Sequence, residues 1–210
     1  MHFVLVHGWG FNGGIWRELR TKLALNARVH ALNLGFVRGG PEDPGTWPNG
    51  GIAVGHSLGV LWLLHNKKSY NFRALVSIQG FDRFWPHIPL PRVERMRREL
   101  AADPPATMSR FWRSCGTVPF APPEHLDVAR LDEGLGWLMD WDETATKANL
   151  DCPVLALASR DDAIVPPAMS SAIWGEEMIV WSEGGGHVLP LSRPEWCAQH
   201  VLDFAHDLES

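Results

Sequence analysis

A serine framed by two glycines is the residue of this sequence best placed for covalent chemistry. The segment Gly55-His56-Ser57-Leu58-Gly59 follows an apolar run at residues 51–54, typical of a buried strand, and precedes an apolar run at 60–64, typical of a helix. A serine on such a sharp strand-to-helix turn presents its hydroxyl at the end of a sheet, and the glycines let other backbone pass close by. The pattern predicts that Ser57 is a nucleophile; the alternative is a glycine-rich turn with a surface serine.

The histidine expected to activate this serine is His187. A serine hydroxyl is a weak nucleophile near neutral pH, so it needs a base within hydrogen-bond reach and a carboxylate that orients the base. His187 follows the last expected strand on the run Gly184-Gly185-Gly186, whose flexibility would let the ring reach the turn. The other nine of the 10 histidines have no comparable setting, and His56 should diverge from Ser57 at the turn.

Two neighbouring carboxylates follow the penultimate expected strand, residues 153–159. Of these, Asp162 lies four residues before Pro166 and is the predicted orienting acid, whereas Asp161 is expected to be a solvated turn or helix-capping residue. Asp82, which follows an earlier expected strand, is an alternative position for the acid. The order serine, acid, histidine along the chain is the order found in folds whose nucleophile lies on such a strand-to-helix turn.

Two backbone N–H groups are predicted to stabilise the negative charge that develops on a substrate oxygen, because such donors must already be in place. One is the N–H of Leu58, the residue after the nucleophile. The other is the N–H of Trp9, in the loop His7-Gly8-Trp9-Gly10. The indole ring of Trp9 is expected to form one wall of the acyl pocket. The alternative for this loop is a tight glycine turn with a core tryptophan.

The elements that would bring these residues together alternate between strands and helices. Strands are expected at residues 2–7, 29–34, 51–54, 73–78, 153–159 and 178–181, and helices at 15–25, 58–65, 167–174 and 194–208. The strands are mostly apolar with little strict alternation, as in strands covered on both faces. This order predicts the α/β class, with a compact, mostly parallel, doubly wound sheet of about six strands. The glycine- and proline-rich segment 35–50 is expected to be a loop.

Residues 81–150 interrupt this alternation. Eight prolines between residues 86 and 123 divide the segment into short helical pieces, and it holds no convincing strand. A helical insertion above the sheet end that carries Ser57 is the usual place for a substrate-selecting lid. We therefore expect a core made of residues 1–80 and 151–210 with an inserted helical lid at 81–150; the alternative is a structural excursion without functional contacts.

Length and composition fit one globular domain without a metal or cofactor. The chain has 210 residues, of which 45% are hydrophobic and 20% charged, and its net charge of −5 argues against general nucleic-acid binding. No apolar run is long enough to span a membrane and no secretion signal opens the sequence, so a cytoplasmic protein is expected. No histidine, cysteine and carboxylate cluster has metal-ligand spacing, and no phosphate-binding loop indicates a nucleotide.

Four motifs, in this order, resemble the α/β-hydrolase superfamily: His7-Gly8-Trp9-Gly10-Phe11-Asn12, the segment around Ser57, Asp162-Ala163-Ile164-Val165-Pro166 and Gly186-His187. The first motif and Gly134-Leu135-Gly136-Trp137-Leu138-Met139-Asp140-Trp141-Asp142 also resemble the pimeloyl-[acyl-carrier protein] methyl ester esterases of biotin synthesis. This resemblance implies a serine carboxylesterase that hydrolyses the methyl ester of a pimeloyl chain on acyl carrier protein through an acyl-enzyme. By position it implies an acyl channel lined by Trp9, Phe111 and Ile164, with basic lid residues meeting the acidic carrier.

Arginines in the expected lid independently favour an acidic partner. From Arg83 to Arg113 there are seven arginines against three acidic residues, a local charge of +4. Arg95 and Arg98 are spaced as neighbours on one helix, and Arg110 and Arg113 as neighbours on another. Such a patch would steer an acidic carrier and its phosphate to the site; the alternative is an ordinary solvated helix face.

Other activities fit the same residues. Within enzymes, the alternatives are a broad-specificity carboxylesterase or thioesterase acting on small acyl esters, and a menaquinone-pathway lyase with the same triad. From another class, the alternative is a non-catalytic binding protein with the hydrolase fold. Labelling of Ser57 by a fluorophosphonate separates that last alternative from the enzymes, because only an activated serine reacts.

Overall fold

The sheet of this protein consists of six parallel strands. The computed structural model describes residues 1–25, 27–39 and 48–209. The strands are β1 (His2–Val6), β2 (Arg28–Leu32), β3 (Gly51–His56), β4 (Phe72–Ile78), β5 (Val154–Ser159) and β6 (Ile179–Ser182). Their order is β2-β1-β3-β4-β5-β6, and every neighbouring pair is parallel. All carboxyl ends therefore lie at one edge of the sheet, where ligands bind in open parallel sheets.

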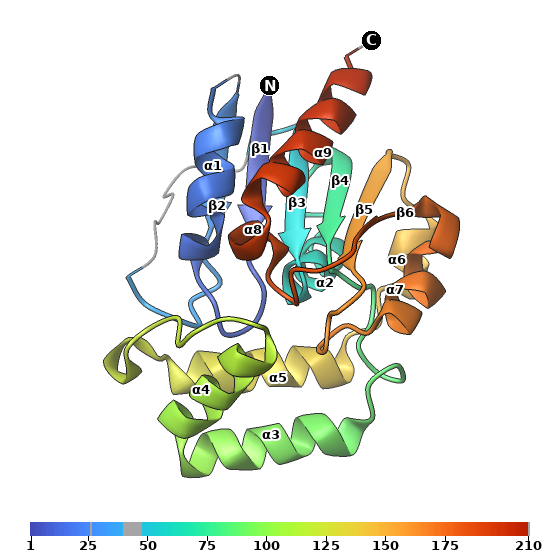
Figure 1. Ribbon diagram of the computed structural model, residues 1–210. Coiled ribbons are helices and arrows are strands. Elements are labelled where there is room, and N and C mark those ends of the chain that lie inside the picture. The colour runs from blue at the N-terminus through green and yellow to red at the C-terminus, as the bar shows by residue number, and fades with distance from the viewer. Residues whose placement is uncertain (26, 40–47, 210) are drawn as a thin grey trace.

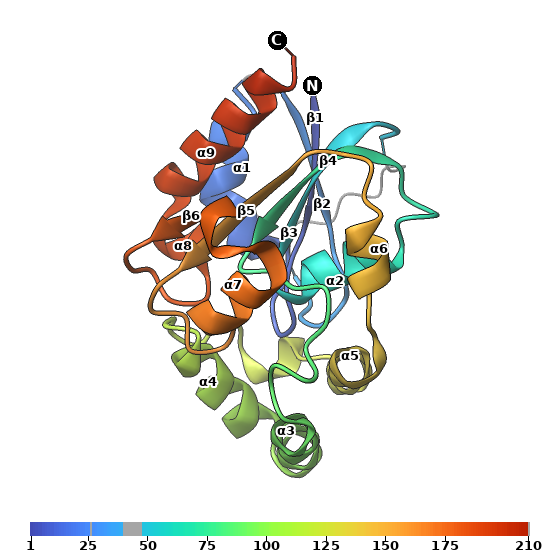
Figure 2. The same ribbon diagram turned by 90° about the vertical axis from the view of Figure 1, so that its right-hand side faces the viewer.

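Helices cover both faces of the sheet. Figure 2 shows α1 (Arg17–Leu23) and α9 (Pro194–Asp207) on one face and α2 (Leu58–His65) and α6 (Thr144–Ala148) on the other. Helix α7 (Pro167–Trp174) packs beside β5 and β6. Because both faces are covered, the strands are apolar on both sides: every residue of β3 is buried, and so are four of the five in β1.

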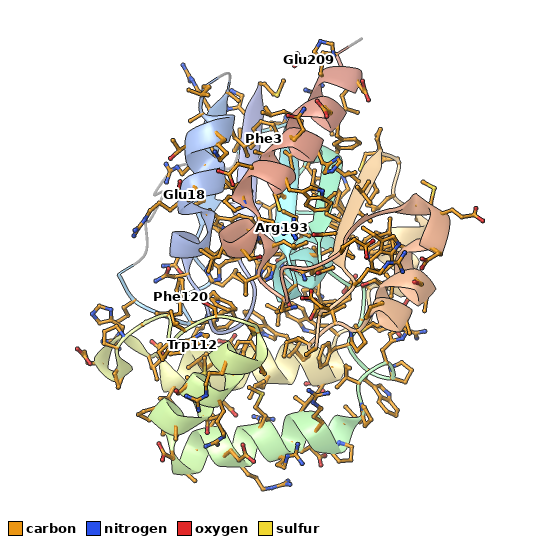
Figure 3. All side chains as sticks on the ribbon, viewed as in Figure 1. Phe3, Glu18, Trp112, Phe120, Arg193 and Glu209 are labelled. Atoms are coloured by element: carbon orange, nitrogen blue, oxygen red, sulfur yellow. The ribbon has the colours of Figure 1, made fainter. Side chains whose placement is uncertain are left out.

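Three helices lie across the carboxyl ends of the strands (Figure 1): α3 (Leu90–Ala102), α4 (Pro104–Ser114) and α5 (Val128–Asp140). Trp112 and Phe120 lie where this layer meets the sheet layer (Figure 3). The Trp112 indole N–H donates to the Gly10 carbonyl at 2.9 Å, and the Phe120 ring packs edge-on against Phe11. Helix α6, later in the same inserted segment, packs instead against α2.

Prolines and capping carboxylates set the limits of the inserted helices, in agreement with the proline pattern of the sequence. Pro104 opens α4, and the Asp103 carboxylate caps it by accepting the Ala106 N–H at 3.1 Å. Asp127 caps α5 in the same way, accepting the Arg130 N–H at 3.0 Å. Among the helices that the structure describes, none combines the length and apolarity needed to cross a bilayer.

The elements expected from the sequence are all present, with bounds shifted by a few residues. The expected strand 29–34 is Arg28–Leu32, and the expected strand 51–54 continues to His56. The expected helix 15–25 is a 3-10 turn, Gly13–Trp16, followed by α1. The short helix α8 (Leu189–Ser192) was not expected. Of the expected loop at 35–50, residues 40–47 lie outside the described residues.

The two glycines that frame Ser57 are required by close packing. A Cβ built on Gly59 would lie 2.2 Å from the carbonyl oxygen of Val6, and one built on Gly55 would lie 2.7 Å from the Val60 side chain. Both distances are shorter than real Cβ contacts, so a side chain at either position would displace its neighbour. Gly59 therefore sets how closely α2 approaches β1, and with it where Ser57 lies.

We expect Gly59→Ala to lower the free energy of unfolding by about 3 kcal/mol, because the added methyl group collides with strand backbone that cannot move aside. Gly136→Ala in α5 is the matched control, since a Cβ at Gly136 meets nothing within 4 Å. Alanine is the better helix former by about 1 kcal/mol, so this control should be neutral or stabilising. Urea unfolding measures both variants, and a Gly59→Ala protein as stable as the control would contradict the packing argument.

Candidate active site

Ser57 lies at the carboxyl end of β3 in a backbone conformation that non-glycine residues rarely adopt. Its φ is 54° and its ψ is −125°. The Ser57 N–H donates to the Ile78 carbonyl at 3.0 Å, which ties the turn to the end of β4, and α2 begins at the next residue. Such strain costs about 1–3 kcal/mol and persists where the surrounding structure enforces it, most often at functional sites.

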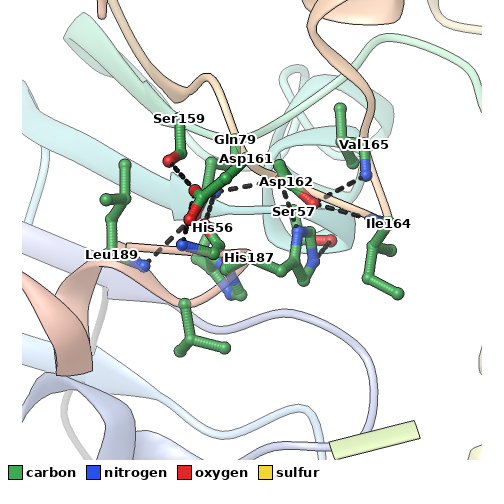
Figure 4. Close-up of polar contacts among 12 residues, drawn as sticks. His56, Ser57, Gln79, Ser159, Asp161, Asp162, Ile164, Val165, His187 and Leu189 are labelled. Carbon is green, nitrogen blue, oxygen red and sulfur yellow. Dashed lines mark hydrogen bonds and ion pairs between the residues drawn. The ribbon is translucent and has the colours of Figure 1, made fainter. Parts of the chain in front are cut away.

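Ser57, His187 and Asp162 form a continuous series of hydrogen bonds (Figure 4). The Ser57 hydroxyl donates to Nε2 of His187 at 3.0 Å, and the Nδ1–H of His187 donates to Oδ2 of Asp162 at 2.8 Å. A carboxylate only accepts hydrogen bonds, so the His187 ring carries its proton on Nδ1 and leaves Nε2 as the acceptor. His187 and Asp162 are 1% and 4% exposed. The structure thus brings together the three side chains that the sequence singles out.

Four N–H groups hold the buried carboxylate of Asp162. Its Oδ1 accepts from the backbone N–H groups of Ile164 and Val165, at 2.8 and 2.9 Å. Its Oδ2 accepts from His187 and from the side-chain amide of Gln79, at 2.8 and 2.9 Å. Burying a carboxylate is costly unless its oxygens are hydrogen-bonded, and these donors meet that requirement.

Asp161 lies in an exposed turn, as expected, but it also anchors the loop that carries His187. It accepts hydrogen bonds from the N–H groups of Gly186 and Gly185, at 2.8 and 3.3 Å, and from the Ser159 hydroxyl. These donors, the hydroxyl foremost, lower the pKa of Asp161 below its ordinary value. Gly185 and Gly186 have φ values of 125° and 63°, which favour glycine. The expectation that Asp161 is only a solvated turn or capping residue was therefore incomplete.

The backbone of His187 is held at both its N–H and its carbonyl. The His187 N–H donates to the Cys115 carbonyl at 3.1 Å, and Nε2–H of His56 donates to the His187 carbonyl at 2.8 Å. His56 makes no hydrogen bond to Ser57 among the described residues, in agreement with the prediction that the two side chains diverge. Burial lowers the pKa of His56 well below its ordinary value, so its ring is a neutral donor at physiological pH.

Asp82, the alternative acid, belongs to a different network. Its Oδ2 pairs with the Lys147 ammonium at 3.0 Å, and the carboxylate is buried. Lys147 also donates to the Ile173 carbonyl and lies over the Trp174 ring. Asp82 therefore links the end of β4 to α6 and α7, and it makes no hydrogen bond to His187 within residues 1–25, 27–39 and 48–209.

The two residues predicted to bind the oxyanion, Trp9 and Leu58, line the same cavity as Ser57. The loop of residues 7–10 passes against Ser57, since a Cβ on Gly8 would lie 2.9 Å from the Ser57 Cβ. The Trp9 backbone N–H has no hydrogen-bond partner in the described part of the chain. The Leu58 N–H lies in the first turn of α2, where a helix supplies no partner of its own. The Trp9 indole N–H donates to the Leu131 carbonyl at 2.8 Å, which fixes the ring as a wall.

A cavity of about 260 Å³ opens at Ser57 between the sheet edge and the inserted helices. Trp9, Phe111 and Ile164, the residues expected to line the acyl channel, all line it. The Trp9 and Phe111 rings pack edge-on with their centroids 4.7 Å apart. The rest of the lining is largely apolar and includes Phe81, Phe84, Ile88, Met96, Leu135 and Leu138. The part of the cavity next to these side chains can therefore receive an apolar group.

The predicted substrate-binding arginines fall into two groups. Arg95 and Arg110 line the cavity, where they flank Glu99 at 3.8 and 3.1 Å. Arg98 and Arg113 are exposed and do not line it, and neither forms an ion pair with another residue that the structure describes. Arg92, which the sequence pattern did not indicate, also lines the cavity.

Gln79 is a part of the site that the sequence pattern did not indicate. It directly follows β4, and its buried side chain lies between Asp162 and the loop that carries His187. The signal that could have pointed to it is its position, a polar residue at the carboxyl end of a central parallel strand.

The cysteines of the described residues are free, and burial disfavours the thiolate form of two of them. No group of three or more histidine, cysteine or acidic side chains among the described residues is arranged to hold a metal ion. The cysteines form no disulfide, and burial raises the pKa of Cys197 to about 12. Burial also raises the pKa of the Cys115 thiol, so neither side chain is the thiolate that a cysteine nucleophile would need.

His7 fixes the start of the loop that carries Trp9. Its Nδ1–H donates to the Gly8 carbonyl at 3.0 Å, and its Nε2 accepts the Leu34 N–H at 2.9 Å. This arrangement requires the neutral ring, because a protonated Nε2 could not accept. Burial lowers the pKa of His7 from 6.5 to about 4.

Comparisons with known proteins find similar proteins over nearly the whole chain. A family model described as the alpha/beta hydrolase family matches residues 3–200. A pimeloyl-[acyl-carrier protein] methyl ester esterase from Sodalis glossinidius is 29% identical over 245 residues, covering 99% of this chain and 94% of that protein. One from Yersinia pseudotuberculosis is 25% identical over 241 residues, covering 97% and 93%. A thermophilic esterase from Thermogutta terrifontis has the same fold, with a TM-score of 0.77 at 17% identity over 100% of this chain and 91% of its own.

We expect the free energy of unfolding to fall by about 3 kcal/mol on account of His7 as the pH is lowered from 6.5 to about 4. In that window the unfolded chain binds a proton at residue 7 that the folded protein excludes, so the stability is complete above pH 6.5 and is lost below it. Urea unfolding at a series of pH values measures this. His7→Asn, which cannot titrate, should remove this part of the pH dependence whatever its stability at neutral pH. An unchanged pH dependence in that variant would contradict the assignment.

Proposed function

The chain belongs to the alpha/beta hydrolase family and is a hydrolase of the esterase kind, and from this premise we propose that it cleaves carboxylic esters with Ser57, His187 and Asp162. The observation that carries the proposal is the unbroken series of hydrogen bonds from the Ser57 hydroxyl through His187 to Asp162, at 3.0 and 2.8 Å. In such a series the serine loses its proton to the imidazole as it attacks, and the carboxylate stabilises the imidazolium that forms.

The proposed reaction has two halves. Ser57 Oγ attacks the ester carbonyl while its proton passes to Nε2 of His187, and the Trp9 and Leu58 N–H groups bind the oxyanion. The tetrahedral intermediate collapses as His187 gives the proton to the departing alkoxide, leaving an acyl group on Ser57. Water, deprotonated by His187, then attacks the acyl-enzyme, and His187 returns that proton to Ser57 Oγ as the acid leaves. Both halves use the same base, which needs its Nδ1–H held by Asp162 throughout.

The substrate we propose is the methyl ester of a pimeloyl chain carried by acyl carrier protein, with methanol as the leaving group. The similar proteins named for this activity support it, at 29% and 25% identity. The cavity supports it too: at about 260 Å³ it is smaller than the roughly 300–1,000 Å³ of pockets for drug-sized ligands, and it is lined mostly by apolar side chains. A broad carboxylesterase or thioesterase would use the same site without needing the carrier.

We assign the inserted segment 81–150 the role of lid over a core of residues 1–80 and 151–210. The charged part of the cavity lining consists of Arg92, Arg95 and Arg110, together with Glu99, which neutralises part of their positive charge. Arg98 and Arg113 add exposed positive charge on α3 and α4. An acidic carrier protein, and the phosphate of its phosphopantetheine arm, would be drawn to such a surface.

Ser57→Ala should reduce the turnover of a short p-nitrophenyl ester by roughly 10⁴–10⁶, as in comparable triad knockouts. The same variant should no longer be labelled by a fluorophosphonate, whereas the wild type should be labelled at Ser57. Circular dichroism is the check that the variant is folded. Turnover that survives the substitution would reject Ser57 as the nucleophile.

The carrier is tested by hydrolysis of pimeloyl-carrier methyl ester at several salt concentrations. Replacing Arg98 and Arg113, which do not line the cavity, by alanine should lower kcat/KM for this substrate severalfold at low salt and flatten its salt dependence, because long-range attraction is screened. Hydrolysis of the p-nitrophenyl ester should change little. Arg73→Ala, an exposed arginine that pairs with Glu209 beyond the lid, is the control. Equal losses on both substrates would count against carrier binding at this surface.

A further inference from the structure

Gln79 is held in an unusual conformation at the edge of the proposed triad. Its φ is 53°, and Ser57 is the other non-glycine residue with positive φ among those the structure describes. Its side chain is 1% exposed. Its N–H donates to the Leu157 carbonyl at 2.7 Å, which fixes the backbone against β5. Such a backbone conformation persists only where the surrounding structure enforces it.

The Gln79 carboxamide uses all of its polar groups on the acid and the histidine loop (Figure 4). Its Nε2 donates to Oδ2 of Asp162 at 2.9 Å and to the Gly186 carbonyl. Its Oε1 accepts the Leu189 N–H at 3.2 Å. One side chain thus connects Asp162 to the residue before His187 and to the second residue after it.

No other neutral side chain of similar length could make these three bonds. The nitrogen faces two acceptors and the oxygen faces a donor, so the amide has one orientation that fits and a flip would break all three contacts. The loop needs contacts from outside it, because Gly185 and Gly186, with φ values of 125° and 63°, restrict their own backbone less than other residues would. Its geometry therefore depends on external anchors, and Gln79 is the anchor that also touches Asp162.

We propose that Gln79 is a positioning residue, which locks the orientation of the Asp162 carboxylate and the His187 loop relative to each other. This inference rests on the proposed function, since the pair it positions is the proposed acid and base. Gln79 touches no reacting atom itself. Without it, Oδ2 of Asp162 would keep only its bond to His187 and the loop of residues 184–189 would lose two hydrogen bonds, so His187 Nε2 would shift from the line of the Ser57 hydroxyl.

Gln79→Met tests this, because methionine has nearly the same length and shape but makes none of the three bonds. We expect kcat for a p-nitrophenyl ester to fall about 10–100-fold, the effect of a small misplacement of a catalytic group. KM should stay within about twofold, since Gln79 does not line the cavity. The acid limb of the kcat/KM profile should move to higher pH, because Asp162 loses an N–H donor and attracts the His187 proton more strongly.

Gln79→Glu is the conservative variant with a different pH response. When protonated, its carboxyl group offers one O–H donor and one acceptor. At low pH its activity should therefore be higher than that of Gln79→Met at the same pH. As it ionises beside Asp162, activity should fall, giving a loss on the alkaline side that the wild type lacks. The other titratable groups that face this site, His187, His56, Asp161 and Cys115, are unchanged in every variant.

Gln199→Met is the matched control, because it makes the same substitution at an exposed position on α9. It should leave kcat and the pH profile unchanged. If Ser57→Ala is inactive but Gln79→Met and Gln79→Glu keep wild-type kcat and acid limb, this inference is wrong while the proposed function stands. If Ser57→Ala is active, the proposed function itself fails. If circular dichroism shows that Gln79→Met does not fold, Gln79→Glu becomes the test. A wild-type pH profile in Gln79→Glu would overturn the inference, and the additional loss of activity on the alkaline side would support it.

Discussion

The site depends on one buried carboxylate. Asp162 is 4% exposed, and a charge at that depth is tolerated only when its oxygens are fully hydrogen-bonded. Its donors come from three strand ends: Ile164 and Val165 after β5, Gln79 after β4 and His187 after β6. The parallel order of these strands places their carboxyl ends together. The topology of the sheet therefore supplies the hydrogen-bond donors that the buried Asp162 carboxylate needs.

The nucleophile adds a second constraint, because Ser57 must be held in a strained turn. The contact of Gly59 with the Val6 carbonyl and the hydrogen bond from Ser57 N–H to Ile78 fix that turn between β1 and β4. The strain is stable because both neighbours are inner strands of the sheet, in which every residue except His2 and Arg73 is buried. The serine therefore meets His187 without help from a bound substrate, as a preorganised site requires.

The parts of the site that could be predicted from the sequence are those with a local pattern. Ser57 is marked by its flanking glycines and His187 by the glycine run before it, and the six strands are marked by apolar runs. The anchors carry no such pattern. Gln79 and His56 act through contacts 83 and 131 residues away, and Cys115 acts through its backbone carbonyl, which any residue type would supply. The observed ends of the strands differ from the predicted ones for a similar reason, because the last hydrogen bond of a strand depends on the neighbouring strand.

The inserted helices do more than cover the cavity, because α4 supports the base. The Cys115 carbonyl, directly after α4, accepts the His187 N–H at 3.1 Å, and Gly186 passes so close that a Cβ there would lie 3.0 Å from the same oxygen. Phe111 on α4 lines the cavity. Any displacement of α4 that widened the cavity would therefore also release one hydrogen bond of the histidine loop. The remaining bonds of that loop go to Asp161, His56 and Gln79, all within the sheet layer, so the base is held jointly by the core and by the inserted helices.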